Sequence, residues 1–431
     1  MSSAFALVSA LLVARSAAAS PEDLFGLGPR SAALGSTGVA SAEGFEATWA
    51  NPALLSSIRR NRLVVGFQGA TYRLDAGGSR VSTRPSRGMI VGAELPMPFG
   101  GVLERRLALG FAFHTPTEIL TRGRILYPDT AQFAWLPTRS ESLTIRAGLG
   151  ADVGHGFKFG VGFAALADLR GEAIIAASGA NGKVASQVET QLVAKFAPTL
   201  GATYEWGARD TKTRVGVTYR GALGARFGVR VDATKLSTLA LPPFEIDGLA
   251  QYDPASLSVE LARETPRFAY ALGASWKRWS EAPNPFSPTV RCPVDTPDCA
   301  ALKPPAIALS DTVVVRLGVE ARRSFRPDVR ARIRVGTFLE PTPVPRDLPA
   351  GDVYDATSGT VVPVPTRTYD ASRVAFTFGT GLDLRLKGVP FSVDAFGQVH
   401  TLVGRTQRTG TEVTPISGTV LATGMTVGVR L

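Results

Sequence analysis

The chain has 431 residues, of which 19% are charged, and it contains 45 glycines and 30 prolines. So many glycines and prolines exclude a mainly helical protein, and no stretch beyond the N-terminal region is long and apolar enough for a membrane helix. The net charge of +11 is not gathered into a patch with interleaved aromatic side chains, so it does not indicate a nucleic-acid partner.

Residues 1–19 have the composition of a secretory signal peptide. An apolar core is followed by Ala17-Ala18-Ala19, a run of small residues that suits cleavage by a signal peptidase. No Lys or Arg precedes the core, and Arg15 lies late in the segment, which points to a displaced translation start. Cleavage after Ala19 would give a mature chain that begins with Ser20.

Residues 20–58 are rich in glycine and alanine and do not alternate as a strand does. Gly26 and Gly28 are spaced as in a dinucleotide-binding loop, but that loop follows a strand and opens a helix. Here the leader precedes it, so we do not interpret it in that way. The segment ends in Asn51-Pro52-Ala53. Its small side chains favour a compact body that packs closely against other parts of the chain.

From about Arg60 to the end, apolar and polar residues alternate in strand-length segments. In the last segment Leu421, Met425 and Leu431 fall on one face, and Gly424 and Arg430 on the other. We predict fourteen strands, at residues 60–73, 87–96, 106–115, 140–153, 156–169, 186–206, 211–223, 254–263, 267–279, 311–323, 328–339, 371–386, 390–403 and 417–431. The seventh strand has the least certain end and could continue to about Asp232.

The connections between these segments alternate between short turns and long Pro-rich loops, which is typical of an outer-membrane β-barrel. A soluble all-β sandwich would also show alternating strands, but its connections would not alternate in length so regularly. We therefore predict an all-β fold, a membrane β-barrel of about fourteen antiparallel strands at residues 59–431, with residues 20–58 as a hatch that plugs the lumen. With a periplasmic N-terminus, every short turn lies in the periplasm of a Gram-negative cell and every long loop lies outside.

The two cysteines, Cys292 and Cys299, lie in one of the long loops. In an exported protein such a pair favours a disulfide over free thiols. A metal site is less favoured, because no His lies nearby and two thiolates alone are a poor ligand set.

Arginines recur on the polar face of the predicted strands. They are Arg146, Arg214, Arg220, Arg316, Arg322, Arg330, Arg332, Arg334 and Arg385. Inside a barrel they could hold the carboxylate of a fatty acid, since Arg is always charged and forks onto carboxylates. The tail would lie against Phe338, Phe396 and the hatch. The alternative is that they pair with inward acids, because a polar lumen wall is normal in barrels.

Several segments resemble the outer-membrane long-chain fatty-acid and hydrocarbon transporters (FadL-like, OmpP1/TodX type). They are the Gly/Ala-rich segment that ends in Asn51-Pro52-Ala53, the run 276–280 (WKRWS), the run 334–345 (RVGTFLEPTPVP), and the segment from Asp370 to the strand with Gly379 and Gly381. These matches come in the family's order and span almost all of the mature chain.

The resemblance implies a monomeric fourteen-stranded barrel with an N-terminal hatch, inserted by the outer-membrane assembly machinery and surrounded by lipid. It also implies passive uptake of a hydrophobic small molecule, which enters from the extracellular loops and leaves sideways where the third strand kinks. The candidates for that lateral opening are Phe111, Phe113, His114 and Pro116. The glycine that the family has after this proline is missing, but Pro116 cannot donate a ladder hydrogen bond, so a local break is still plausible. Phe111 and Phe113 share a face, so they could also simply face lipid.

An enzymatic function is not predicted. The chain has three histidines, His114, His155 and His400, and no nucleophile elbow that fits a barrel. We expect no cofactor and no metal. Besides transport, a second hypothesis stays open, in which the barrel is a scaffold or shuttle that binds a protein partner at the outer membrane. The long loops are rich in proline and contain few large apolar residues. A transporter should offer an apolar capture site in these loops, so their composition leaves the second hypothesis open.

Overall fold

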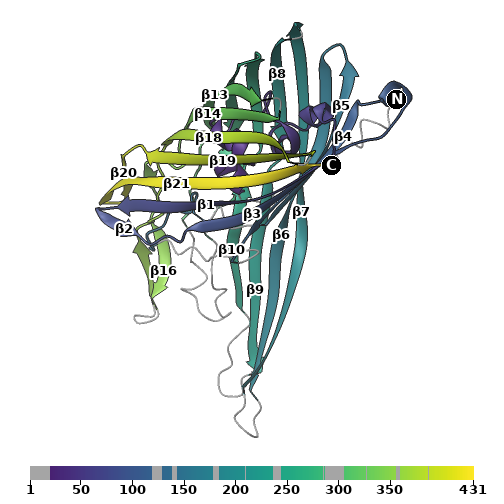
Figure 1. The fold of residues 1–431 in the computed structure, drawn as a ribbon. Coiled ribbons are helices and arrows are strands. Elements are labelled where there is room, and N and C mark those ends of the chain that lie inside the picture. Colours follow the sequence, from purple (N-terminus) through teal and green to yellow (C-terminus); the bar gives the residue numbers. More distant parts are fainter. Residues whose placement is uncertain are drawn as a thin grey trace, which may run out of the picture.

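The computed structural model describes residues 20–118, 129–137, 143–177, 184–208, 210–235, 244–284, 286, 305–326, 328–355, 360–386 and 388–431. Fourteen antiparallel strands form a closed β-barrel (Figure 1), and β21 pairs with β1 to close it. The strands are β1 (Arg62–Ala76), β3 (Ser86–Pro96), β4 (Leu107–Pro116), β5 (Thr144–Gly154), β6 (Phe157–Ala177), β7 (Val184–Ala208), β8 (Thr211–Arg220), β11 (Ser256–Glu264), β12 (Phe268–Lys277), β13 (Thr312–Arg326), β14 (Val329–Glu340), β18 (Arg373–Leu386), β19 (Val389–Leu402) and β21 (Glu412–Arg430).

The outer face of the barrel is apolar and the inner face is small or polar. Along β1, Leu63, Val65 and Phe67 point outward and are 48%, 41% and 59% exposed, while the alternate residues Val64 and Gln68 are buried. Successive side chains of a strand point to opposite faces, so one face of each strand can meet lipid. No helix in the described part of the chain is both long and apolar enough to cross a bilayer.

Short turns join the strands at one end of the barrel, as the sequence predicted. The long connections at the other end contain further strands that the sequence did not predict: β2 (Ser79–Val81), β9 (Leu223–Lys235), β10 (Phe244–Asp253), β15 (Asp347–Leu348), β16 (Gly351–Asp355), β17 (Thr360–Val364) and β20 (Arg405–Thr409). Short 3-10 helices η3 (Gly101–Leu103) and η5 (Trp279–Glu281) lie in two of the connections.

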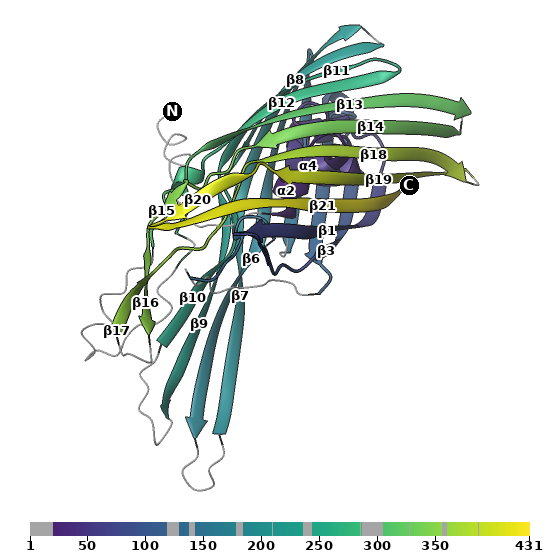
Figure 2. The ribbon, with the colours of Figure 1, turned by 90° about the vertical axis from the view of Figure 1, so that its left-hand side faces the viewer.

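The seventh strand does not continue to Asp232. The chain leaves the ladder after Arg220, and β9 starts a separate hairpin with β10. β9 then pairs in parallel with the outer part of β6, from Leu169 to Ala176. Strands β6, β7, β9 and β10 therefore continue as a blade beyond the ring of the barrel (Figures 1 and 2).

The third barrel strand, β4, pairs with both neighbours over its described length. Its pairing with β3 runs from Ala108 to Pro116, and its pairing with β5 runs from Leu107 to His114, without a register shift in either ladder. The predicted kink is therefore not seen within β4. An opening beside this strand would require ladder hydrogen bonds to break.

Residues 20–58 lie inside the ring of strands (Figure 2). They form α2 (Pro21–Phe25), α3 (Pro29–Ala33), η1 (Gly44–Glu46), α4 (Ala47–Ala50) and η2 (Pro52–Ser57), and nearly all of their side chains are buried. Helix α3 packs against β14, β18 and β19, while η2 packs against β4 to β7. The segment thus touches walls built from distant parts of the chain. We call it the N-terminal segment.

The long-loop end of the barrel is covered by buried apolar side chains. One cluster contains Trp135, Tyr252, Trp279, Phe286, Ile307, Leu309, Val344 and Leu348. A second cluster joins Phe133 and Leu136 to Leu24 and Phe25 of the N-terminal segment. The few large apolar residues of these loops are therefore concentrated in a cap over the lumen, an arrangement that their polar composition did not indicate.

Candidate functional site

The N-terminal segment fits against a wall of inward-facing glycines. A Cβ added at Gly160 would lie 2.2 Å from Ala53 N, and one at Gly150 would lie 2.5 Å from Ser56 N. Such separations are far below van der Waals contact, so only glycine lets the two backbones approach this closely. The barrel wall and the segment are therefore shaped to each other.

The Asn51-Pro52-Ala53 triplet fastens the segment to this wall. The Asn51 side-chain amide donates to Val39 O at 2.7 Å, to Ala202 O at 3.1 Å and to Thr203 Oγ1 at 3.1 Å. Its carbonyl accepts from Ala53 N at 3.0 Å. The side chain is fully buried, so losing these bonds would leave unsatisfied polar groups. This triplet was predicted as part of the hatch, and its contacts fit that role.

On the opposite wall, Glu260 of β11 holds the segment through backbone groups. Its carboxylate accepts from Gly38 N at 2.7 Å, from Val39 N and Ala40 N at 3.0 Å, and from Ser41 Oγ at 2.6 Å. Four donors around one buried carboxylate compensate for its desolvation.

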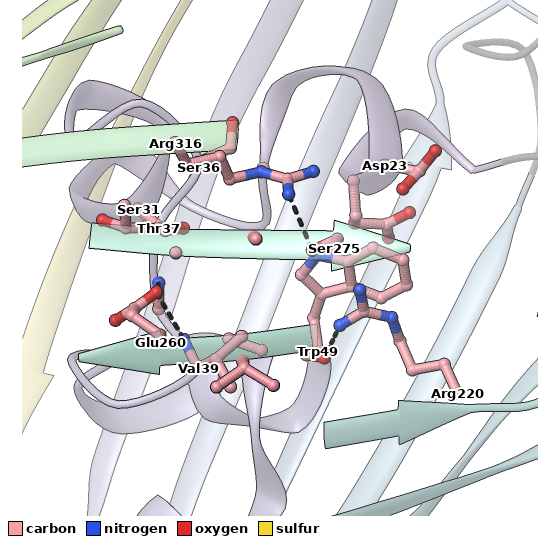
Figure 3. A pocket seen from close by; sticks show the side chains of 17 residues that line it. Asp23, Ser31, Ser36, Thr37, Val39, Trp49, Arg220, Glu260, Ser275 and Arg316 are labelled. Atoms are coloured by element: carbon pink, nitrogen blue, oxygen red, sulfur yellow. Dashed lines mark hydrogen bonds between the residues drawn. The ribbon is translucent and has the colours of Figure 1, made fainter. Parts of the chain in front are cut away.

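A small cavity, which we call the lumen cavity, lies between the N-terminal segment and strands β8, β11, β12 and β13 (Figure 3). Its lining includes Trp49 from α4, Ser275 from β12, Arg220 from β8 and Arg316 from β13. The acids in the lining already have partners: Glu260 binds the segment, and Asp23 accepts from Lys277 Nζ at 2.6 Å.

Two arginines of the cavity are linked through serine hydroxyls. Arg316 donates to Ser275 Oγ at 2.7 Å, the hydroxyls of Ser258 and Ser275 are 2.7 Å apart, and Arg220 donates to Ser258 Oγ at 3.3 Å. Arg220 also donates to Trp49 O at 3.1 Å and lies 4.1 Å from the Trp49 ring centroid. Among the described residues, neither guanidinium has a carboxylate within ion-pair distance. Asp23 and Glu260 line the same cavity without bonding to either guanidinium.

Comparisons with known proteins agree with this architecture. No family model matches the sequence, and no curated protein matches it. Among solved structures, a Pseudomonas aeruginosa FadL homologue aligns with a TM-score of 0.53 at 13% identity, covering 93% of this chain and 96% of that one. The P. putida toluene transporter TodX aligns with a TM-score of 0.51 at 16% identity over 95% and 99%. The monoaromatic hydrocarbon channel CymD gives 0.52 at 14% over 95% and 98%.

This chain has a FadL-like fold. The predicted resemblance is confirmed at the level of architecture, because the alignments cover almost all of both chains. Identities this low carry no information about individual site residues, which must be placed from the contacts of this chain.

In this FadL-like barrel the other predicted substrate-binding arginines lie in ion pairs. Arg332 pairs with Asp383 at 2.7 Å, and Arg334 pairs with Glu320 at 2.8 Å and with Asp394 at 2.7 Å. The exposed Arg385 lies at a short turn, with its nearest acid at 3.8 Å. Of the nine predicted arginines, Arg220 and Arg316 line the lumen cavity.

The two predicted tail-binding aromatics are buried by protein contacts. Phe338 packs against Val314 and Ala375 and meets the His400 ring edge-on at 5.3 Å. Phe396 belongs to a buried cluster with Phe25 of the N-terminal segment and borders another small cavity. Neither lies in the cavity that holds Arg316.

The residues predicted for a lateral opening divide between the two faces of β4. Phe111 is 38% exposed on the outer face, and Phe113 shares that face. His114 is 2% exposed on the lumen side, and Pro116 is also buried. Cys292 and Cys299 lie outside the described residues, so their predicted disulfide stays a prediction. No group of three or more His, Cys, Asp or Glu in the described chain is arranged to hold a metal ion.

The N-terminal segment also carries one unusual acid, Glu46. Its carboxylate accepts from Arg30 N at 3.0 Å and from Ser31 N at 2.8 Å, at the start of α3. Burial raises the pKa of Glu46 to about 7. The group therefore changes charge in the neutral range while it holds two turns of the segment together.

Sequence reasoning missed Trp49 and the bridging hydroxyls of Ser258 and Ser275. Both serines stand on the polar faces of their strands, but the sequence does not show that they are cross-strand partners. Trp49 comes from the N-terminal segment, and its stacking between Arg146 and Arg220 at 4.2 Å and 4.1 Å depends on how the segment is seated.

Proposed function

We propose that this barrel lies in the outer membrane of a Gram-negative bacterium and lets hydrophobic or amphipathic small molecules pass. The closed ring of fourteen strands with an apolar outer face supports a membrane location. The fold neighbours TodX and CymD, described as a toluene transporter and a monoaromatic hydrocarbon channel, support a small hydrophobic cargo. We propose no enzymatic reaction, cofactor or metal.

The observation that carries the proposal is the pair Arg220 and Arg316 in the lumen cavity. Two guanidiniums bridged by Ser258 and Ser275 form a row of donors to which no described carboxylate is directly bonded, although Asp23 and Glu260 line the same cavity. A carboxylate is the group that such a row binds best. The indole of Trp49 supplies an apolar surface beside it. The favoured cargo is therefore a carboxylate with an apolar body, such as a fatty or aromatic acid.

We also propose a route for the cargo through the barrel. Cargo would enter between the extracellular loops, pass the cap and reach the lumen cavity after movement of the hatch, residues 20–58. A lateral exit beside β4 would start at its outer end, where pairing with β5 ends at His114 and pairing with β3 ends at Pro116. Pro116 cannot donate a ladder bond, so that end is the weakest part of the strand.

Binding of decanoate to the purified barrel tests the lumen site. We expect the Arg220→Ser/Arg316→Ser double variant to lose about tenfold or more in affinity, because two charge-assisted hydrogen-bond donors are removed. Arg385→Ser is the matched control, since it removes one charge at an exposed turn. Equal affinity of the double variant and the control would reject the lumen site.

The scaffold hypothesis keeps one specific observation in its favour. Residues 184–198 of β7 pair with β6 on one side, and the described pairings give them no partner on the other. An unpaired strand edge outside the membrane can accept a strand from a partner. Removing the outer halves of β6 and β7 should abolish capture of such a partner and leave decanoate binding unchanged.

A further inference from the structure

A second and larger cavity lies at the short-turn end of the barrel, below the N-terminal segment. Its lining comprises Ala42, Glu43, Gly44, Leu54, Ser57, Ile58, Arg59, Arg60, Arg62, Glu94, Arg214, Glu264 and Arg430. We call it the mouth cavity. It is separate from the lumen cavity, with which it shares no lining residue.

The acids of the mouth cavity are all engaged by arginines. Glu94 pairs with Arg62 at 3.2 Å, and Glu264 pairs with Arg214 at 2.8 Å. Glu43 pairs with three arginines of the segment and the wall, at 3.2 to 3.5 Å. Each negative charge of the lining is thus neutralised within the protein.

Two other arginines that line the same cavity form no ion pair within the described chain. Arg59 is exposed and donates only to backbone carbonyls, one of them Ile58 O at 3.0 Å. Arg60 is exposed and makes no ion pair or hydrogen bond within the described chain. Two adjacent guanidiniums without an acid give this mouth an excess of positive charge, which attracts anions.

The upper wall of the mouth cavity is apolar. Leu54, Ile58 and Ala42 belong to one buried cluster of the N-terminal segment, and each also lines the cavity. An apolar wall beside free guanidiniums matches a molecule with a charged head and an apolar body. A small inorganic anion would leave the apolar wall unused.

We propose that the mouth cavity is a second binding site, for an amphipathic anion that carries one carboxylate or phosphate. The site rests on the proposed function, because it would hold cargo that has passed the hatch. Arg59 and Arg60 bind the head group, and Leu54 and Ile58 contact the body.

The same chemistry could come from a free amphiphile or from the head group of a membrane lipid. The geometry favours the free molecule. Arg62 and Arg430 stand opposite each other on β1 and β21, and both line the cavity inside the ring. By contrast, the exposed Arg323 and Arg326 of the same end are not part of its lining.

The test is photolabelling of the purified full barrel with a diazirine analogue of decanoate, followed by peptide mapping. We expect labelling of the peptide that contains Leu54 and Ile58. In Arg59→Ser/Arg60→Ser this labelling should fall about fivefold to tenfold, since two partly exposed charge contacts are lost. Arg323→Ser/Arg326→Ser removes the same charge outside the cavity and should label as the parent does. Equal labelling in both double variants would overturn the proposal.

Two further arms separate the alternatives. In Arg316→Ser the peptide that contains Leu54 and Ile58 should still be labelled. A loss of binding at the lumen cavity is therefore distinguishable from a loss of binding at the mouth cavity. In nanodiscs, replacing zwitterionic lipid with phosphatidylglycerol should leave the labelling unchanged. A strong reduction by phosphatidylglycerol would show that the site belongs to lipid head groups and would overturn the assignment to free cargo.

Discussion

Replacing Gly160 by alanine tests whether the N-terminal segment is seated by the glycine wall. The new Cβ would lie 2.2 Å from both Ala53 N and Pro52 C. These are backbone atoms that cannot rotate away, so the segment must move by at least about 1 Å to restore contact. Overpacking of this kind costs roughly 1–3 kcal/mol, and the shift also strains the hydrogen bonds of Asn51, each worth about 1 kcal/mol.

The sum is about 3 kcal/mol, which corresponds to roughly a hundredfold change in an opening equilibrium. Hydrogen exchange of the amides at residues 47–57 should therefore speed up by about that factor in Gly160→Ala. Gly273→Ala is the matched control, because its Cβ would meet nothing closer than 3.4 Å. If the two variants exchange at the same rate while both barrels remain folded, the glycine wall does not seat the segment.

Three further predictions concern the contacts of the N-terminal segment. Glu260→Gln should speed hydrogen exchange at residues 38–41, because an amide has one acceptor oxygen instead of two; unchanged rates would contradict the anchoring role. The pKa of Glu46 is raised from 4.5 to about 7. The protonated carboxyl therefore contributes to the stability of the folded segment, fully below pH 4.5, and this contribution is lost as the pH rises through 7. The loss is worth up to roughly 3 kcal/mol of folding free energy. Hydrogen exchange of the segment's amides, corrected for intrinsic rates, should therefore speed up as the pH rises over this range. In Glu46→Gln the corrected exchange rates should not change with pH in this way. Arg334→Leu should lower thermal stability by roughly 1–3 kcal/mol, since it removes the ion pair of the partly buried Asp394 and one of the three arginine contacts of Glu320, which keeps Arg30 and Arg322. Arg385→Ser should leave the melting temperature unchanged.

The barrel itself could be predicted because its constraint is local. The alternation of residues and the lengths of the turns follow from lipid on one side and a polar lumen on the other. All fourteen predicted strands are present, with ends that mostly shift by a few residues. Strands β9 and β10 were missed. They pair with each other as a hairpin, but only β9 joins this hairpin to β6, a segment far away in the sequence, and no local pattern encodes that pairing.

The site was predictable only in part. That arginines face the lumen follows from strand parity, and the sequence predicted nine of them in this way. Which arginine is neutralised depends on where the acids of the N-terminal segment and the neighbouring strands come to lie. Arg334 meets Glu320 on the neighbouring strand β13 and Asp394 on β19, two strands away, whereas Arg316 meets only a serine. That difference is set by cross-strand register, which alternation alone does not fix.

Flux of radiolabelled decanoate into proteoliposomes that contain the purified barrel tests the central claim most directly. The account predicts uptake well above that of empty liposomes, with a strong reduction in Arg220→Ser/Arg316→Ser and none in Arg385→Ser. Uptake equal to that of empty liposomes, with the barrel correctly inserted, would contradict transport. Undiminished uptake in the double variant would contradict the role of the lumen cavity.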